Sequence, residues 1–223
     1  MKTEQPWLSI FETFKTKKEQ LTGEAIRQRS IIAHLAKEEN SALMTRTAIA
    51  QKLAKKDGLL WKNIYSGIFR DLVEVLIPLD IVTESGRLPL KRGPKALQEK
   101  GIPCYQLTTR GLLAALSISE LENKRSTLNE FLSKAEIDDS MLTDSIKVLE
   151  KISPKFVHFI FEAYVRAYCE GKFEDLLPFS VSQIGKISHD SFLIQRELLE
   201  GFTSLPKPKK TKILKLFSKF ESI

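Results

Sequence analysis

Residues 81–113 constrain the fold of this chain more than any other stretch. An alternating, β-branched segment over residues 79–83 predicts a strand, and residues 105–108 are its natural partner. Repeated Gly and Pro residues between the two segments disfavour a helix there. We therefore predict two antiparallel strands joined by a long loop, with Thr109 capping a helix over residues 111–116.

The loop of this predicted hairpin is basic. Between the strands, five cations stand against Glu84 and Glu99, namely Arg87, Lys91, Arg92, Lys95 and Lys100. Cations that neutralise phosphates release bound counterions, and this release drives binding to nucleic acids. The basic segment over residues 83–106 is therefore a candidate for phosphate contact. A solvated surface loop of the same composition is the alternative.

Two helices are predicted immediately before the hairpin. Thr45 or Thr47 can cap the first, which runs to Lys56, and Asp57-Gly58 supplies a stop signal. The second covers residues 60–76, where apolar side chains recur every four positions, at Ile64, Ile68, Leu72 and Leu76. A tight turn between two such helices is the arrangement of a helix-turn-helix.

The polar residues of the second helix fall largely off its apolar stripe. In a helix-turn-helix, early residues of the second helix reach base edges in the major groove. Asn pairs well with adenine, and Arg or Lys with guanine. The candidates for base readout are therefore Lys62, Asn63, Ser66 and Arg70. Gly67 allows close approach to a neighbouring helix or to DNA, and an ordinary helical hairpin with a solvated face is the alternative.

Residues 21–116 resemble the winged helix-turn-helix domains of prokaryotic, especially archaeal, DNA-binding proteins. The segments that carry this resemblance are TAIAQKL, IFRDLVEVLIPLDIV and CYQLTTRGLLAAL, the last with the pattern YxLTxxG. The resemblance implies three helices plus a two-stranded wing. It also implies binding to double-stranded DNA, commonly as a homodimer that regulates transcription. The wing of this chain, residues 83–106, is unusually long.

The chain as a whole is predicted to be mainly α and to have three parts. Residues 1–20 form a helical arm, because Trp7, Leu8, Phe11 and Phe14 have helical spacing. Residues 21–118 form the winged helix-turn-helix domain. Residues 119–223 form an all-α region for dimerisation or for binding a protein partner. Its central helix, residues 154–170, is apolar almost all round, and its last helices cover residues 192–202 and 209–220.

Composition excludes several other classes of protein. The formal net charge is +7, which favours an anionic partner. The two cysteines form no CxxC pair and the three histidines share no metal-ligand spacing, so no metal or other cofactor is expected. The sequence contains no P-loop, GxGxxG or GxSxG motif, and we expect no enzyme. Without a signal-like or spanning apolar run, we expect a cytoplasmic protein with no membrane partner.

These patterns predict a DNA-binding protein that regulates transcription, with a recognition helix over residues 60–76 and a basic wing. The leading alternative is a winged-helix adaptor that joins proteins in a larger assembly without touching DNA. RNA binding ranks third, because RNA recognition uses exposed aromatic side chains and the wing offers Tyr105, which is expected in a strand. The lysines near the C-terminus could contact phosphates outside the main footprint, or could be a solvated helix face.

Overall fold

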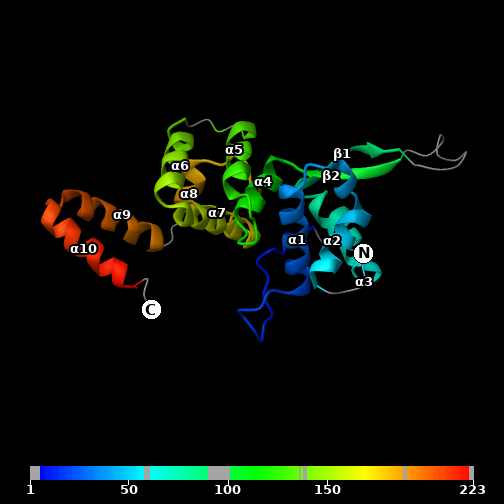
Figure 1. Ribbon diagram of the computed structural model, residues 1–223, viewed down its shortest axis with the longest axis horizontal. Coiled ribbons are helices and arrows are strands. Elements are labelled where there is room, and N and C mark those ends of the chain that lie inside the picture. The colour runs from blue at the N-terminus through cyan, green and yellow to red at the C-terminus, as the bar shows by residue number, and fades with distance from the viewer. Residues whose placement is uncertain are drawn as a thin grey trace, which may run out of the picture. The chain divides into compact units, whose positions relative to one another are not determined.

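The computed structural model describes residues 6–57, 61–89, 101–135, 137, 140–187 and 190–220. The chain is mainly helical with one small two-stranded antiparallel sheet (Figure 1), which confirms that part of the prediction. It divides into two compact units, Met1–Val181 and Ser182–Ile223. No helix in the described part of the chain is long and apolar enough to cross a membrane.

The first unit begins with three helices. They are α1 (Gly23–Lys37), α2 (Arg46–Asp57) and α3 (Trp61–Arg70), with the short 3₁₀ turn η1 (Ser41–Leu43) before α2. The hydroxyl of Thr45 accepts a hydrogen bond from the Ala48 amide at 3.3 Å, so Thr45 caps α2 as one of the two predicted candidates. The fully buried Ile31, Ile32 and Ile49 pack this helical layer.

The helix predicted over residues 60–76 does not remain α-helical to its end. After Arg70 the backbone widens into a π-helical turn, η2 (Asp71–Leu76). Ile68, Leu72 and Leu76 of its apolar stripe are fully buried, as their spacing predicted. Gly67 admits the side chain of Arg27 from α1, since a Cβ at Gly67 would lie 3.0 Å from Arg27 Nε. The close neighbour of this glycine is therefore a side chain of the adjacent helix.

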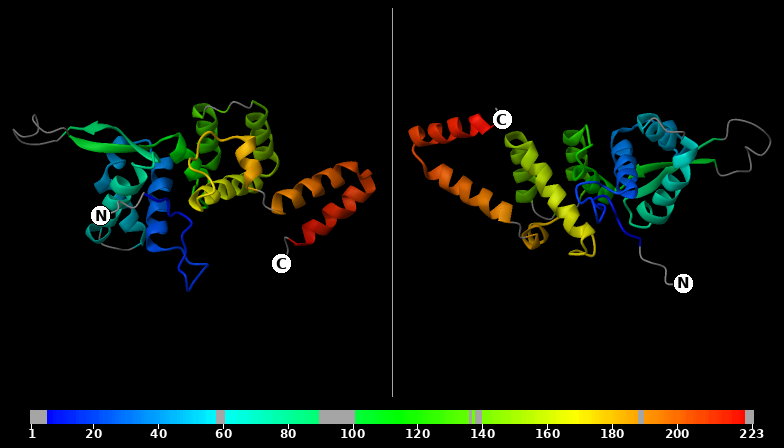
Figure 2. Two further views of the ribbon diagram at one scale, coloured as in Figure 1. Left: turned by 180° about the vertical axis from the view of Figure 1, so that it is seen from behind. Right: turned by 90° about the horizontal axis from the view of Figure 1, so that it is seen from below.

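The two strands pair antiparallel as predicted, with shifted bounds. β1 (Val82–Leu88) pairs with β2 (Ile102–Leu107) from Val82 opposite Leu107 to Leu88 opposite Ile102, with an irregularity between Glu84 and Gly86. The first strand was predicted over residues 79–83. It begins later because Asp80 takes a φ of 52°, which a strand does not allow. Figure 2 shows the hairpin projecting from the helices α1–α3.

The strand β2 also ties the hairpin to the start of α2. The Tyr105 amide donates to the Met44 carbonyl at 3.0 Å, and Thr45 forms an isolated antiparallel bridge with Cys104. Tyr105 is buried in the strand as expected, so its ring is not displayed for stacking on a base. The base of the hairpin therefore has a fixed position relative to α2.

The helix after the hairpin is capped one residue earlier than predicted. α4 (Thr109–Leu116) has Thr108 as its N-cap, whose hydroxyl accepts from the Gly111 amide at 3.1 Å. The same hydroxyl lies within reach of the Asp80 and Ile81 carbonyl oxygens. Thr108 was missed because two threonines are adjacent, and spacing alone cannot choose between them. This cap joins the end of β2 to the turn that precedes β1.

The predicted helical arm over residues 1–20 is wrong for the described residues 6–20, which form turns and one bridge between Thr13 and Leu21. Leu8 and Ile10 are buried in the core, whereas Trp7 is 52% exposed. Leu8, Ser9 and Ile10 are thus buried consecutively, which one face of a short amphipathic helix does not allow. A side chain of α1 satisfies the backbone here, because the Ser9 amide donates to Gln28 Oε1 at 2.9 Å.

The first compact unit continues past the boundary predicted after residue 118. All residues of α4 from Gly111 onward are buried, and α4 packs against α1 on one side and against later helices on the other. These later helices are α5 (Lys124–Lys134) and α7 (Pro154–Cys169), and α6 (Ser140–Ile152) packs on α7. A helix buried on both sides cannot mark the edge of a domain, so α4 joins the two predicted parts into one core.

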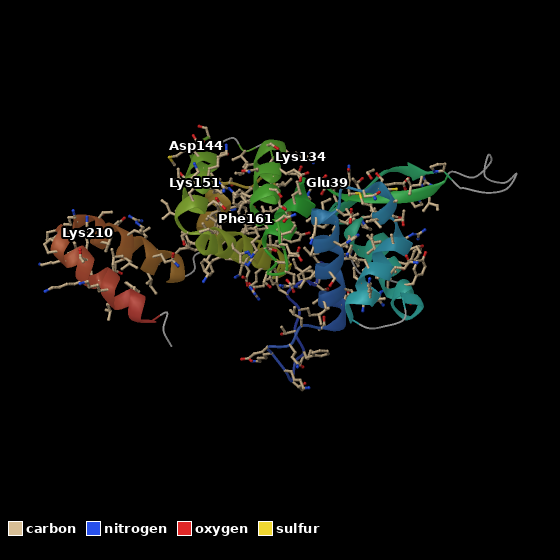
Figure 3. The ribbon with its side chains drawn as sticks, in the orientation of Figure 1. Glu39, Lys134, Asp144, Lys151, Phe161 and Lys210 are labelled. Carbon is tan, nitrogen blue, oxygen red and sulfur yellow. The ribbon has the colours of Figure 1, made fainter. Side chains whose placement is uncertain are left out.

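An aromatic cluster holds this helical region together. The ring centroids of Phe161 on α7 and Phe131 on α5 lie 5.9 Å apart, and Phe179 lies 5.3 Å from Phe161. Phe161 is labelled in Figure 3 among these helices. The apolar helix predicted over residues 154–170 is therefore central to a helical core, as α7 (Pro154–Cys169).

The second unit is a helical hairpin. It contains most of α8 (Val181–Lys186), followed by α9 (Asp190–Ser204) and α10 (Lys207–Phe220), which meet at the turn between them (Figures 1 and 2). Lys210 Nζ donates to the Thr203 carbonyl at 3.0 Å and lies 5.8 Å from the centroid of the Phe202 ring. These contacts fix the turn of the hairpin, where a break was predicted around residues 205–208.

Candidate nucleic-acid interface

The exposed side of α3 and η2 carries four residues three or four positions apart. These residues, Ser66, Phe69, Arg70 and Val73, form what we call the α3 outer face. Ser66 and Arg70 are exposed, and Phe69 and Val73 are each 38% exposed. Lys62 and Asn63 lie in the first turn of the same helix, and their side chains are outside the described part of the structure.

The guanidinium of Arg70 is only loosely held. Its Nη2 lies 3.5 Å from a carboxylate oxygen of Glu24, and its side chain is 54% exposed. By contrast, Arg27 Nε donates to Asp71 at 2.7 Å, and the Asp71 side chain is fully buried. Burial raises the pKa of Asp71, and the hydrogen bond from Arg27 opposes that rise. Arg27 therefore anchors η2 to α1, while Arg70 can turn toward an external anion.

Arg46 stands at the edge of the α3 outer face, and the sequence reasoning missed it. Its guanidinium carbon lies 4.5 Å from the centroid of the Phe69 ring, a cation–π contact between α2 and α3. Among the described residues, Arg46 has no carboxylate partner. A cation in the first turn of a helix opposes the helix dipole. That unfavourable placement was a signal that could have identified Arg46 from sequence.

The described part of the β1–β2 hairpin is electrically balanced. Arg87, a predicted phosphate contact, has its Nε 2.5 Å from Glu84 Oε1 and a second nitrogen 2.9 Å from Glu84 Oε2. These two residues are the charged side chains of residues 82–89 and 101–107. Any net positive charge of the hairpin therefore comes from its tip. The predicted tip residues lie outside the described part of the chain, namely Lys91, Arg92, Lys95 and Lys100.

Two histidines and one cysteine of the first unit have structural surroundings rather than a catalytic arrangement. Ring nitrogens of His34 and His158 each lie 2.9 Å from a backbone carbonyl oxygen, of Leu43 and Leu116 respectively. Burial raises the pKa of Cys169 to about 12, so its thiol stays protonated at neutral pH. Within the described residues, no three His, Cys, Asp or Glu side chains are grouped to hold a metal ion.

No family model matches the sequence, and neither a curated protein nor a solved structure matches it. The geometry of α2, α3 and the β1–β2 hairpin is therefore the basis on which a function can be proposed.

Proposed function

We propose that residues 21–116 form a winged helix-turn-helix domain that binds double-stranded DNA and serves in the regulation of transcription. The observation that carries the proposal is the α3 outer face, an exposed surface with Arg70 and with Arg46 at its edge. In support, α2 and α3 pack closely, and the strand β2 is hydrogen-bonded to the start of α2. A helix-turn-helix presents its second helix and its hairpin to one duplex in this way.

The residues of the α3 outer face differ in what they would contact. Arg70 and Ser66 would reach base edges, together with Lys62 and Asn63 from the first turn of α3. Phe69 and Val73 are suited to the methyl groups of thymine. Arg46, at the N-terminus of α2, would contact a phosphate that flanks the groove.

The hairpin would contribute phosphate contacts from its tip. Arg87 is paired with Glu84 and would add little. The lysines and arginine of the loop, Lys91, Arg92, Lys95 and Lys100, would supply the positive charge. Each phosphate contact adds about 0.9 to the slope of log affinity against log salt concentration.

The test measures anisotropy of a labelled pool of random duplexes with the full chain over a range of salt concentrations. We expect salt-dependent binding, with a slope reduced by about 0.9 in Arg46→Ala and by about 2.7 when Lys91, Arg92 and Lys95 are all changed to Ala. Arg125→Ala is the matched control, because Arg125 is an exposed arginine on α5. Unchanged slopes in both variants would refute the proposed interface.

Base readout needs a separate measurement. Selection of bound duplexes from the random pool should yield a preferred site for the wild-type chain. Arg70→Ala is expected to lose the preference at one or two base pairs, at a cost of about 1–3 kcal/mol. A uniform loss of affinity across all sequences would contradict base readout by Arg70.

A protein-binding adaptor is the second candidate, and one observation favours it. Phe69 and Val73 leave apolar surface exposed on the α3 outer face, and aromatic side chains are enriched at protein interfaces. Retention on heparin, measured beside the mass from size exclusion, separates the two candidates. Weak retention with a large heteromeric mass would favour the adaptor, whereas retention that weakens with salt supports DNA binding.

A further inference from the structure

The second compact unit has almost no core of its own. None of the described side chains of α9 or α10 is buried. Large apolar side chains on both helices are about half exposed or more: Leu193, Ile194, Leu198, Leu199, Leu214 and Leu216. Exposed apolar surface on this scale is typical of an interaction site.

A hairpin of this size needs an external source of stability. The unit covers residues 182–223, and chains of roughly 40 residues usually require a disulfide, a metal or association with another chain. Both cysteines of the protein, Cys104 and Cys169, belong to the first unit. The described residues offer no metal-binding group. Association is therefore the source that fits this unit.

The charges of the two helices are complementary. α10 carries six lysines and no acidic residue. On α9, Arg196 is paired with Glu200 at 2.7 Å, and the exposed Glu197 adds a further negative charge. Two copies of α10 placed side by side would repel one another, whereas α9 beside α10 brings opposite charges together. The hairpin is thus complementary to a second hairpin of the same sequence.

We propose that the α9–α10 hairpin is a dimerisation element, in which α9 of one chain packs against α10 of a second copy. The four helices then form a bundle around the exposed apolar residues. Ile194 and Leu198 are one turn apart on α9, and Leu216 lies on α10. In the dimer these side chains leave water, and Glu197, which lies about 60° from Ile194 around α9, faces the lysines of the partner's α10. This inference does not depend on the proposed DNA binding.

The mass of the full chain in solution tests the apolar part of this proposal. Light scattering after size exclusion should give twice the chain mass of 25.4 kDa. The double variant Leu198→Gln with Leu216→Gln should raise the dimer dissociation constant by at least about a hundredfold, because each dimer loses four buried leucines. Leu193→Gln is the matched control: Leu193 is 61% exposed but points about 140° away from Leu198 around the helix.

A charge reversal tests which helices meet. Glu197→Lys keeps every apolar side chain and places a cation of each chain against the lysines of the partner's α10. We expect the dissociation constant to rise on the order of tenfold at low salt and the effect to shrink at high salt. Arg196→Glu, on the same helix, should not weaken the dimer. If α9 packed on α9 instead, glutamate would face glutamate in the wild type and lysine would face lysine in the variant. The repulsion would be equal, and the dimer dissociation constant would stay unchanged.

Each outcome decides the proposal. A wild-type chain that stays monomeric at micromolar concentration would overturn it, and so would a glutamine double variant that stays dimeric. An unchanged dissociation constant in the charge-reversal variant would overturn the pairing of α9 with α10. Far-UV circular dichroism on every variant shows whether helices are kept. If the glutamine variant loses helix, the charge reversal still tests the dimer.

Discussion

Gly111→Ala is expected to destabilise the first compact unit, although alanine is the better helix former. Gly111 lies in the first turn of α4, where a Cβ would stand 2.0 Å from the Ile81 carbonyl oxygen and 3.0 Å from the Cβ of Leu107. An ordinary carbon–oxygen contact is about 3.3 Å. The carbonyl cannot easily move away, because it accepts the Thr108 amide at 3.1 Å while the Ile81 amide donates to Leu76.

The size of the effect follows from two opposing contributions. Overpacking a core costs about 1–3 kcal/mol, and a fixed backbone carbonyl places Gly111→Ala at the upper end. The replacement of a helical glycine by alanine raises the free energy of unfolding by about 1 kcal/mol. We therefore expect the free energy of unfolding to fall by about 2 kcal/mol.

Urea unfolding followed by tryptophan fluorescence measures this change. Both tryptophans, Trp7 and Trp61, belong to the first unit, so the signal reports on that unit alone. Gly23→Ala is the matched control, because a Cβ there meets only Arg27 Nη1 at 3.8 Å, an ordinary contact. It should change the stability by no more than about 0.5 kcal/mol. If Gly111→Ala proves as stable as the wild type, the close approach of α4 to Ile81 is refuted.

Three further predictions concern contacts of the same unit. Arg27→Met leaves the buried Asp71 without its partner and should cost about 3 kcal/mol at neutral pH in urea unfolding. Burial raises the pKa of Asp71, and a group with a raised folded-state pKa lowers the stability as pH rises through that pKa. The stability deficit of Arg27→Met should therefore shrink in acid. An equal deficit at pH 4 and pH 7 would contradict the reasoning. Thr108→Val removes the α4 cap and should cost about 1–2 kcal/mol, whereas a change within error would show that the cap is dispensable. The hydrogen bond from Arg110 lowers the pKa of Asp175, so its stabilisation is present above the unfolded pKa near 4 and lost as pH falls through the lower folded value. Asp175→Asn should therefore flatten the acid side of the stability profile, by less than about 1 kcal/mol for this half-exposed pair.

Local periodicity was enough to predict several elements. The four-residue spacing that ends at Ile68, Leu72 and Leu76 predicted three side chains that are fully buried. Alternation and Gly/Pro content predicted the strand pair, and Pro154 starts α7 where a missing amide hydrogen costs nothing. These features depend on neighbours within one or two turns of the chain, which sequence patterns report directly.

Long-range contacts decided what the patterns missed. Leu8 belongs to a set of apolar residues with helical spacing, but Leu8 and Ile10 are buried in the core within a segment that is not helical. The predicted domain boundary after residue 118 failed to anticipate that α4 is buried on both sides. Similarly, Arg29 reaches Glu120 across 91 residues at 2.9 Å, a partner that no local pattern identifies. Spacing could place Ser66 and Arg70 on a polar face, but only tertiary contact joins Arg46 to it.

The distribution of ion pairs shows why net charge is a poor guide to the interface. Arg27, Arg29 and Arg110 each hold a carboxylate within the first unit, and Arg87 holds Glu84. Their charges add to the total but are not available to a phosphate. In the described part of α2 and α3, Arg46 and Arg70 are the arginines left for an external anion, so these two helices would neutralise few phosphates and the other contacts would come from the loop cations.

Because α2 and α3 of one domain would make few phosphate contacts, dimerisation would strengthen the proposed DNA binding. If the α9–α10 hairpin joins two chains, two α3 outer faces can occupy successive half-sites of one duplex, and the phosphates neutralised by each domain add in one binding event. The second domain then binds at a high effective concentration rather than from bulk solution. The variant Leu198→Gln with Leu216→Gln, which is expected to separate the two chains, should thus halve the salt slope without changing a residue proposed to contact DNA. Loss of slope in this variant, at an unchanged half-site preference, would distinguish this coupling from direct contact between the α9–α10 hairpin and phosphates.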